Sequence, residues 1–101
     1  MKKFVISFSS NALEDINRLE NIIVGHYKAP LTAVKYIQGL KDTIKLLANF
    51  PDAFPFNTIK SLQKYGPFSR HVSYKQMTII FSVYKGTVYI HSIVPSKSIT
   101  Q

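Results

Sequence analysis

The chain has 101 residues, a formal net charge of +8 and no cysteine. This length fits one domain, residues 1–101, with a single hydrophobic core. The absence of cysteine excludes disulfides and thiolate metal sites, and it suits a reducing compartment.

The positive charge is concentrated in the second half of the chain. All five acids lie within residues 1–52, where seven Lys and Arg leave a balance of +2. The remaining 49 residues contribute +6 and contain no acid. Their cations are Lys60, Lys64, Arg70, Lys75, Lys85 and Lys97. This asymmetry favours an anionic partner, either nucleic acid or an acidic protein segment, over a basic surface that serves solubility alone.

The N-terminal segment lacks the pattern of a signal peptide. Lys2 and Lys3 precede a short apolar run that Ser7 interrupts and that ends at Ser9. The run is too short for the apolar region of a signal peptide, and no later stretch approaches membrane-spanning length. We therefore expect a cytoplasmic protein with no membrane partner.

The first half predicts a strand followed by two helices. Residues 4–8 alternate as a strand does, and a helix is expected over residues 11–27. Ser9-Ser10-Asn11 supplies N-cap candidates, and Asn11 with Glu14 approximates a capping box. Apolar residues recur at steps of four and three over residues 31–49, which indicates a second helix. Ala29-Pro30 separates the helices by so short a connection that we expect an antiparallel hairpin.

Residues 51–67 have no sustained period and predict a loop longer than compact domains usually contain. Ile59 and Leu62 are expected to hold this loop to the core through a short helical turn. Lys60 and Lys64 are four residues apart, which would place both on one exposed side of that turn.

Three strands are expected over residues 68–74, 77–84 and 87–94, because apolar and polar residues alternate there. Lys85-Gly86 is a good hairpin turn, and Lys75-Gln76 is a weaker one, since it lacks Gly, Asn and Asp. The order strand, helix, helix, three strands predicts the α+β class, with an antiparallel sheet and the helical hairpin on one of its faces.

Two-residue turns in both hairpins place His71, Ile80 and His91 in one row across three strands. The two histidines would lie about 9.6 Å apart, two strand spacings, which is too far to ligate one ion, so no metal site is expected. They can instead flank an RNA phosphate, one as base and the other as acid. The alternative is that both are ordinary polar residues on a solvated strand face.

Arg70 conflicts with this register, because it falls on the apolar face of the sheet. A bulge or an irregular turn at Lys75-Gln76 would turn the strand over and bring Arg70 to the open face. We favour this reversal, which removes His71 from the row.

The residues present limit the chemistry further. No carboxylate follows Asp52, so paired-acid catalysis on the sheet is excluded. Neither a Gly-x-Ser-x-Gly elbow nor a phosphate-binding glycine loop is present. Metal-independent RNA cleavage by basic and imidazole groups is the enzyme class that remains, and we expect no cofactor.

The chain resembles the RelE/ParE superfamily of bacterial toxins, in its order of elements and in three stretches. Leu46-Leu47-Ala48-Asn49-Phe50-Pro51 is similar to the Leu-rich end of the ParE-like second helix and the Phe-Pro that follows it. Arg70 precedes the alternating residues 77–81, as in that branch, and residues 87–94 look like the family's closing strand.

The resemblance implies a toxin of a type II toxin–antitoxin module, as in plasmid stabilisation, which arrests growth and is neutralised by an acidic antitoxin. RelE-like members cut mRNA on the ribosome with Lys and Arg and often a C-terminal Tyr or His, whereas ParE-like members block DNA gyrase. If the chain is a nuclease, its candidate catalytic residues are Arg70, His91 and Lys97. The candidate nucleic-acid contacts are Lys60, Lys64, Arg70 and Lys75.

The sequence departs from the nuclease pattern beyond its last strand. Many members have His or Arg there, but this chain reads Pro95-Ser96-Lys97-Ser98 and stops at Gln101 without a C-terminal aromatic residue. We therefore favour ParE-like blocking of gyrase over mRNA cleavage. A further alternative is an inactive module with the same fold, whose partner is its antitoxin alone.

Overall fold

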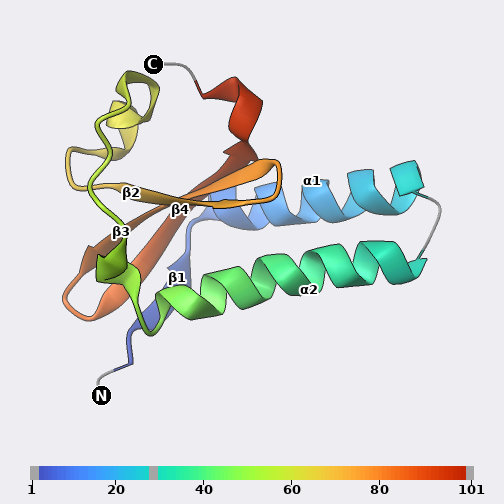
Figure 1. The fold of residues 1–101 in the computed structure, drawn as a ribbon, viewed down its shortest axis with the longest axis horizontal. Coiled ribbons are helices and arrows are strands. Elements are labelled where there is room, and N and C mark those ends of the chain that lie inside the picture. The colour runs from blue at the N-terminus through green and yellow to red at the C-terminus, as the bar shows by residue number, and fades with distance from the viewer. Residues whose placement is uncertain (1–2, 28–29, 100–101) are drawn as a thin grey trace.

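The computed structural model describes residues 3–27 and 30–99. Within these residues the chain forms two long helices, four strands and three short 3₁₀ helices (Figure 1). In chain order they are β1 (Val5–Phe8), α1 (Ser10–Tyr27), α2 (Pro30–Leu47), η1 (Pro51–Ala53), η2 (Lys60–Tyr65), β2 (Arg70–Tyr74), β3 (Met77–Tyr84), β4 (Thr87–Pro95) and η3 (Ser96–Ser98). The predicted α+β order is confirmed. The predicted break at Ala29-Pro30 lies partly outside the described residues, which resume at Pro30.

The four strands form one sheet in the order β1-β4-β3-β2. The neighbours β2, β3 and β4 are antiparallel, as expected. β1 runs parallel to β4, with Val5 opposite Thr87 and Phe8 opposite Ile90, so the sheet is mixed rather than wholly antiparallel. No local turn could reveal this pairing, because both helices and the other two strands lie between β1 and β4 in the chain.

Helices α1 and α2 lie side by side and antiparallel, as the predicted hairpin requires, and they cover one face of the sheet (Figure 1). We call this face the helix side. The core between the layers combines helix residues with alternate residues of β3 and β4. Its central members are Leu19, Ile23, Leu40, Ile44, Leu47, Ile79, Phe81, Val88 and Ile90.

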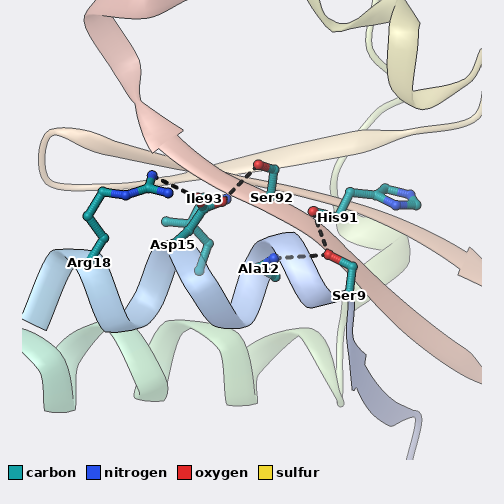
Figure 2. A network of polar contacts seen from close by, with 7 residues as sticks. All are labelled: Ser9, Ala12, Asp15, Arg18, His91, Ser92 and Ile93. Atoms are coloured by element: carbon teal, nitrogen blue, oxygen red, sulfur yellow. Dashed lines mark hydrogen bonds and ion pairs between the residues drawn. The ribbon is translucent and has the colours of Figure 1, made fainter.

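Helix α1 is capped by Ser9 rather than by Asn11. The Ser9 hydroxyl oxygen accepts a hydrogen bond from the Ala12 backbone N–H at 3.0 Å, as N-cap side chains do. The same hydroxyl donates to the carbonyl of His91 at 2.7 Å. The predicted capping box at Asn11 is therefore wrong, because the helix already begins at Ser10, and the true cap also ties α1 to β4 (Figure 2).

Both hairpins have two-residue turns, as predicted at Lys85-Gly86, whereas the bulge or irregular turn favoured at Lys75-Gln76 is not formed. Tyr74 pairs with Met77 across the first turn, and Tyr84 pairs with Thr87 across the second. The first residue of each turn is a lysine whose backbone lies in the left-handed region. Lys75 has φ 52° and Lys85 has φ 47°.

The register of β4 changes at His91. Phe81 pairs with Ile90 as expected, but Ile80 pairs with Ser92, so His91 is the additional residue of a β-bulge. The predicted pair of Ile80 with His91 is therefore wrong.

Asp15 of α1 holds β4 immediately after the bulge (Figure 2). One of its carboxylate oxygens accepts hydrogen bonds from the Ser92 hydroxyl at 2.9 Å and from the Ile93 backbone N–H at 3.0 Å. The other oxygen lies 3.3 Å from the Arg18 guanidinium. Together with the bond from the Ser9 cap to the His91 carbonyl, these contacts hold β4 at His91 and immediately after it.

The segment between α2 and β2 packs against both faces of the sheet at its β2 edge. Phe54 makes an edge-to-face contact with Phe81 of the helix-side core, with ring centroids 6.0 Å apart. Asn57 and Ser69 are buried and share a hydrogen bond of 3.0 Å. Leu62 of η2 is buried as predicted.

Candidate functional site

His91 projects from the face of the sheet opposite the helices. Phe81 and Val83 pack in the helix-side core, so Ser82 between them faces the other way. The Nε2 atom of His91 lies 2.7 Å from the Ser82 hydroxyl oxygen. Tyr65 of η2 stacks on the imidazole, with ring centroids 5.9 Å apart and planes inclined by 25°. We call His91, Ser82 and Tyr65 the imidazole cluster.

Burial lowers the pKa of His91 from its ordinary value of 6.5, because a partly buried imidazolium loses hydration. The ring is therefore neutral at pH 7, and a neutral imidazole with a hydroxyl at hydrogen-bond distance can act as a general base. Lys64 brings a positive charge to the edge of the cluster, with its ammonium 5.4 Å from the centroid of the Tyr65 ring.

His71 does not join this cluster. It pairs with Ile80 in the register predicted for a two-residue turn, and its Nδ1 is hydrogen-bonded to the side-chain oxygen of the buried Asn57. Ile80 is itself fully buried, so this part of the face is covered. The two histidines therefore do not flank a common site for an RNA phosphate.

The accessible part of this face lies near the β3–β4 turn. Tyr84 is 61% exposed and Tyr89 is 41% exposed. Tyr89 pairs with Ser82, and Tyr84 lies two residues along β3 on the same face. Aromatic side chains at this exposure suit contact with a partner surface more than they suit a closed reaction site.

Arg70 remains on the helix side of the sheet. It pairs with Phe81, in the register of a regular two-residue turn, so the predicted reversal of β2 is wrong. Its guanidinium donates to the carbonyl of Phe54, lies 4.2 Å from the centroid of the Phe56 ring and comes within 3.6 Å of the Asp52 carboxylate. These partners stabilise the positive charge of Arg70 on the helix side of the sheet. The strand therefore need not be reversed to bring Arg70 to the open face.

The sequence did not reveal these partners, nor the contact of Tyr65 with His91. All of them come from residues 51–65, where no regular period indicates which side chains turn inward. One signal of the Arg70 partners was present in the sequence. Asp52 is the last acid of the chain and directly precedes the basic half that contains Arg70.

The lysines predicted to bind nucleic acid, and the catalytic candidate Lys97, are divided between separate elements. Lys60 and Lys64 are exposed on η2, but residues four apart do not align on a 3₁₀ helix, which has three residues per turn. Lys75 occupies the β2–β3 turn and Lys97 lies in η3, and both line a groove beside α1. Lys75 and Lys97 therefore lie at the same groove, and Lys64 lies beside the imidazole cluster. Arg70 lies in neither place.

Comparison with known proteins identifies the fold. No family model and no curated protein matches the chain. Among solved structures, it is similar to a chain of the chromosomal ParDE TA (toxin–antitoxin) system from P. aeruginosa, with a TM-score of 0.74 and 16% identity over 92% of this chain and 96% of that chain. The chain has the RelE/ParE-like fold. This confirms the fold that the strand, helical hairpin and three-stranded meander predicted.

The RelE/ParE-like sheet thus carries its bulged histidine on the face away from the helices and its arginine on the helix side. Within the part of the chain that the structure describes, no helix is long and apolar enough to cross a membrane. No group of three or more His, Cys, Asp or Glu side chains that could hold a metal ion occurs among the same residues.

Proposed function

We propose that this chain is the toxin of a toxin–antitoxin module and that it arrests growth by blocking DNA gyrase in the cytoplasm. The likeness to a chain of a ParDE TA system supports the first part. The second half of the chain, with six cations and no acid, supports neutralisation by an acidic antitoxin. The ParE-like sequence features at residues 46–51 and 77–81 support gyrase as the target.

The observation that carries target blocking over RNA cleavage is the position of Arg70. A cationic clamp stabilises a reacting phosphate only if it lies beside it. The Arg70 guanidinium is engaged by the Phe54 carbonyl and Asp52 on the helix side, whereas His91 lies on the opposite face beside Ser82. A toxin that acts by binding needs no such convergence.

Ribosome-dependent mRNA cleavage is the second candidate, and the imidazole cluster favours it. A neutral His91 can accept the proton of an RNA 2′-hydroxyl, and Lys64 stands near enough to the cluster to contact a phosphate. Lys97, in this case, would contribute a contact from η3. A toxin-fold module without activity is the remaining candidate.

Two parallel reactions test these candidates. The purified protein is added to a gyrase supercoiling reaction and to a coupled translation reaction that contains ribosomes. We expect supercoiling to be inhibited while full-length mRNA persists in the translation reaction. Loss of full-length mRNA only when ribosomes are present would overturn the gyrase proposal in favour of cleavage, and no effect in either reaction would indicate an inactive module.

A further inference from the structure

β1 is an edge strand, and no strand of the described residues lies on its outer side. The Val5 N–H faces inward, because it donates to the Gly86 carbonyl at the start of β4 at 3.0 Å. Alternate residues of a strand direct their backbone groups to opposite sides, so the N–H and C=O groups of Ile6 and Phe8 face outward. Unpaired backbone groups at a sheet edge are a template for another strand.

A groove of about 400 Å³ lies beside this edge, between α1 and α2. Its lining is mostly apolar and comes from all three elements: Ile6 and Phe8 of β1, Leu13 and Ile16 of α1, and Leu40 and Ile44 of α2. Leu13 is 51% exposed, and Val5, which points to the other face of β1, is 64% exposed. The edge therefore combines unpaired backbone groups with apolar side chains that contact with another molecule would cover.

The rim of this groove carries charges of both signs. Glu20 lies on α1, and Lys41 and Lys45 lie about one turn apart on α2. None of the three forms an ion pair with another described residue. The groove residues belong to the first 52 residues, which contain all five acids and have a balance of only +2. The net charge of +8 therefore opposes contact between two copies less here than at the basic half of the chain.

Antiparallel pairing of two β1 strands would bring these opposite charges together. The end of β1 leads into α1, which carries Glu20. The start of β1 lies beside the end of α2, because the Phe4 N–H donates to the Ala48 carbonyl at 2.7 Å. In an antiparallel pair the end of one strand lies beside the start of the other. α1 of each copy would then lie next to α2 of the other copy, with Glu20 facing Lys41 and Lys45.

We infer that two copies of this chain associate through β1 as a symmetric dimer, with one sheet of eight strands, four from each copy. The two-fold axis passes beside Ser7, so Ile6 of each copy pairs with Phe8 of the other. A symmetric contact requires a surface that is complementary to itself, and an open strand flanked by an acid on one helix and cations on the other meets this requirement. The inference goes beyond the proposed function and does not depend on the target of the toxin.

Self-association is measured by sedimentation velocity of the purified chain at concentrations from about 1 to about 100 μM, in about 0.15 M salt. We expect the mass of one chain at the lowest concentration and of two chains at the highest. Amide hydrogen exchange followed by NMR locates the contact. The N–H groups of Ile6 and Phe8 should become protected as the concentration rises, because they gain acceptors in the other copy.

Charge reversals test the pairing of the helices. Glu20→Lys should weaken self-association roughly a hundredfold, because the symmetric contact occurs twice and each loss costs roughly tenfold. Lys41→Glu combined with Lys45→Glu should do the same. The control combines Lys60→Glu with Lys64→Glu on η2, near the opposite edge of the sheet, and should not weaken self-association. Both double variants replace two cations by two anions, so a difference between them reports position rather than net charge.

A mixture of variants gives a result that misfolding cannot produce. Glu20→Lys alone and the variant with Lys41→Glu and Lys45→Glu alone should each remain monomeric. When the two are mixed, we expect a heterodimer, because every contact across the interface then joins a cation to an anion. Native mass spectrometry identifies the heterodimer by its mass.

Three results would overturn the inference. These are a chain that stays monomeric at about 100 μM, a dimer in which the exchange of the Ile6 and Phe8 amides is unchanged, or a mixture of the two variants without heterodimer. Growth arrest on expression is measured separately. A monomeric chain that arrests growth refutes the dimer and leaves the toxin proposal standing, and a dimer that has no effect on growth does the reverse.

Discussion

Arg70 brings a positive charge to the helix side of the sheet, where its side chain is only 14% exposed. Burying a guanidinium is costly unless its donors and its charge are matched. The Phe54 carbonyl accepts a hydrogen bond from the guanidinium, and the Phe56 ring and Asp52 meet its charge. The buried Nε has no hydrogen-bond partner among the described residues. All three partners stand on the segment that follows α2. Arg70 therefore connects this segment to β2, which is a structural role.

This role predicts that Arg70→Ala lowers the free energy of unfolding by about 1–3 kcal/mol, because the Phe54 carbonyl loses its donor and the Phe56 ring loses its partner. Urea unfolding followed by circular dichroism measures the change. Arg70→Met keeps the apolar stem and should recover part of the loss. Wild-type stability in Arg70→Ala combined with loss of growth arrest would contradict a structural role.

His91 predicts a pH dependence of stability. Its pKa in the folded chain is lowered by burial from 6.5, so the unfolded chain binds more protons as the pH falls. The contribution of the neutral ring is complete above pH 6.5 and is lost as the pH falls through the lowered pKa. The free energy of unfolding of the wild type should therefore decrease over this window more than that of His91→Gln. Equal slopes for the two proteins would show that the imidazole is not desolvated.

At the scale of elements, the turn at Lys85-Gly86 was predictable, whereas the regular turn at Lys75-Gln76 and the bulge were not. Local alternation and an X-Gly turn are sufficient to set a hairpin register, and the pairs beside Lys85-Gly86 agree with it. The bulge adds one residue to β4, so the core positions are Val88, Ile90 and Ile93 rather than an unbroken alternation. The polar Ser92 followed by Ile93 was the signal of this phase change, but its cause is the contact with Asp15 in distant α1.

Asp15 should therefore contribute more to stability than other acids of the helices. Asp15→Ala leaves the Ser92 hydroxyl and the Ile93 N–H without their acceptor, and we expect a loss of about 1–3 kcal/mol in the free energy of unfolding. Asp42 is exposed and bonds to Gln38 on the same helix at 2.9 Å, so Asp42→Ala is the matched control and should change stability by about 0.5 kcal/mol or less. If denaturant titrations give equal losses of unfolding free energy for the two variants, the Asp15 link between α1 and β4 does not stabilise the fold.

Substitution by alanine should have opposite effects on stability at two helix glycines, Gly39 in α2 and Gly25 in α1. A Cβ atom at Gly39 would lie 2.2 Å from the Tyr74 hydroxyl oxygen, and that hydroxyl is held by a 2.8 Å hydrogen bond to the Tyr36 carbonyl. Gly39→Ala should thus destabilise the fold by about 1–3 kcal/mol. A Cβ atom at Gly25 in α1 would meet nothing within 4 Å, so Gly25→Ala should stabilise the fold by up to about 1 kcal/mol. Thermal melts of both variants check the signs, and stabilisation by Gly39→Ala would refute the close contact.

For the whole molecule, the sequence predicted the order of elements, the helical hairpin and the meander, because each depends on local periodicity. It could not predict what depends on contacts between distant segments: the parallel pairing of β1 with β4, the partners of Arg70 and the stacking of Tyr65 on His91. These contacts separate the basic residues into different surfaces. Lys75 and Lys97 face a groove beside α1, whereas His91 and Lys64 lie on the face opposite the helices.

This separation is the basis for proposing a toxin that acts by binding rather than by cutting RNA. The most direct test is growth arrest in a bacterial culture on induced expression of the His91→Ala chain, measured as colony-forming units beside the wild type. We predict that the variant arrests growth as completely as the wild type, because the imidazole has no catalytic task in target blocking. Loss of arrest in a variant whose melting temperature equals that of the wild type would contradict this mechanism.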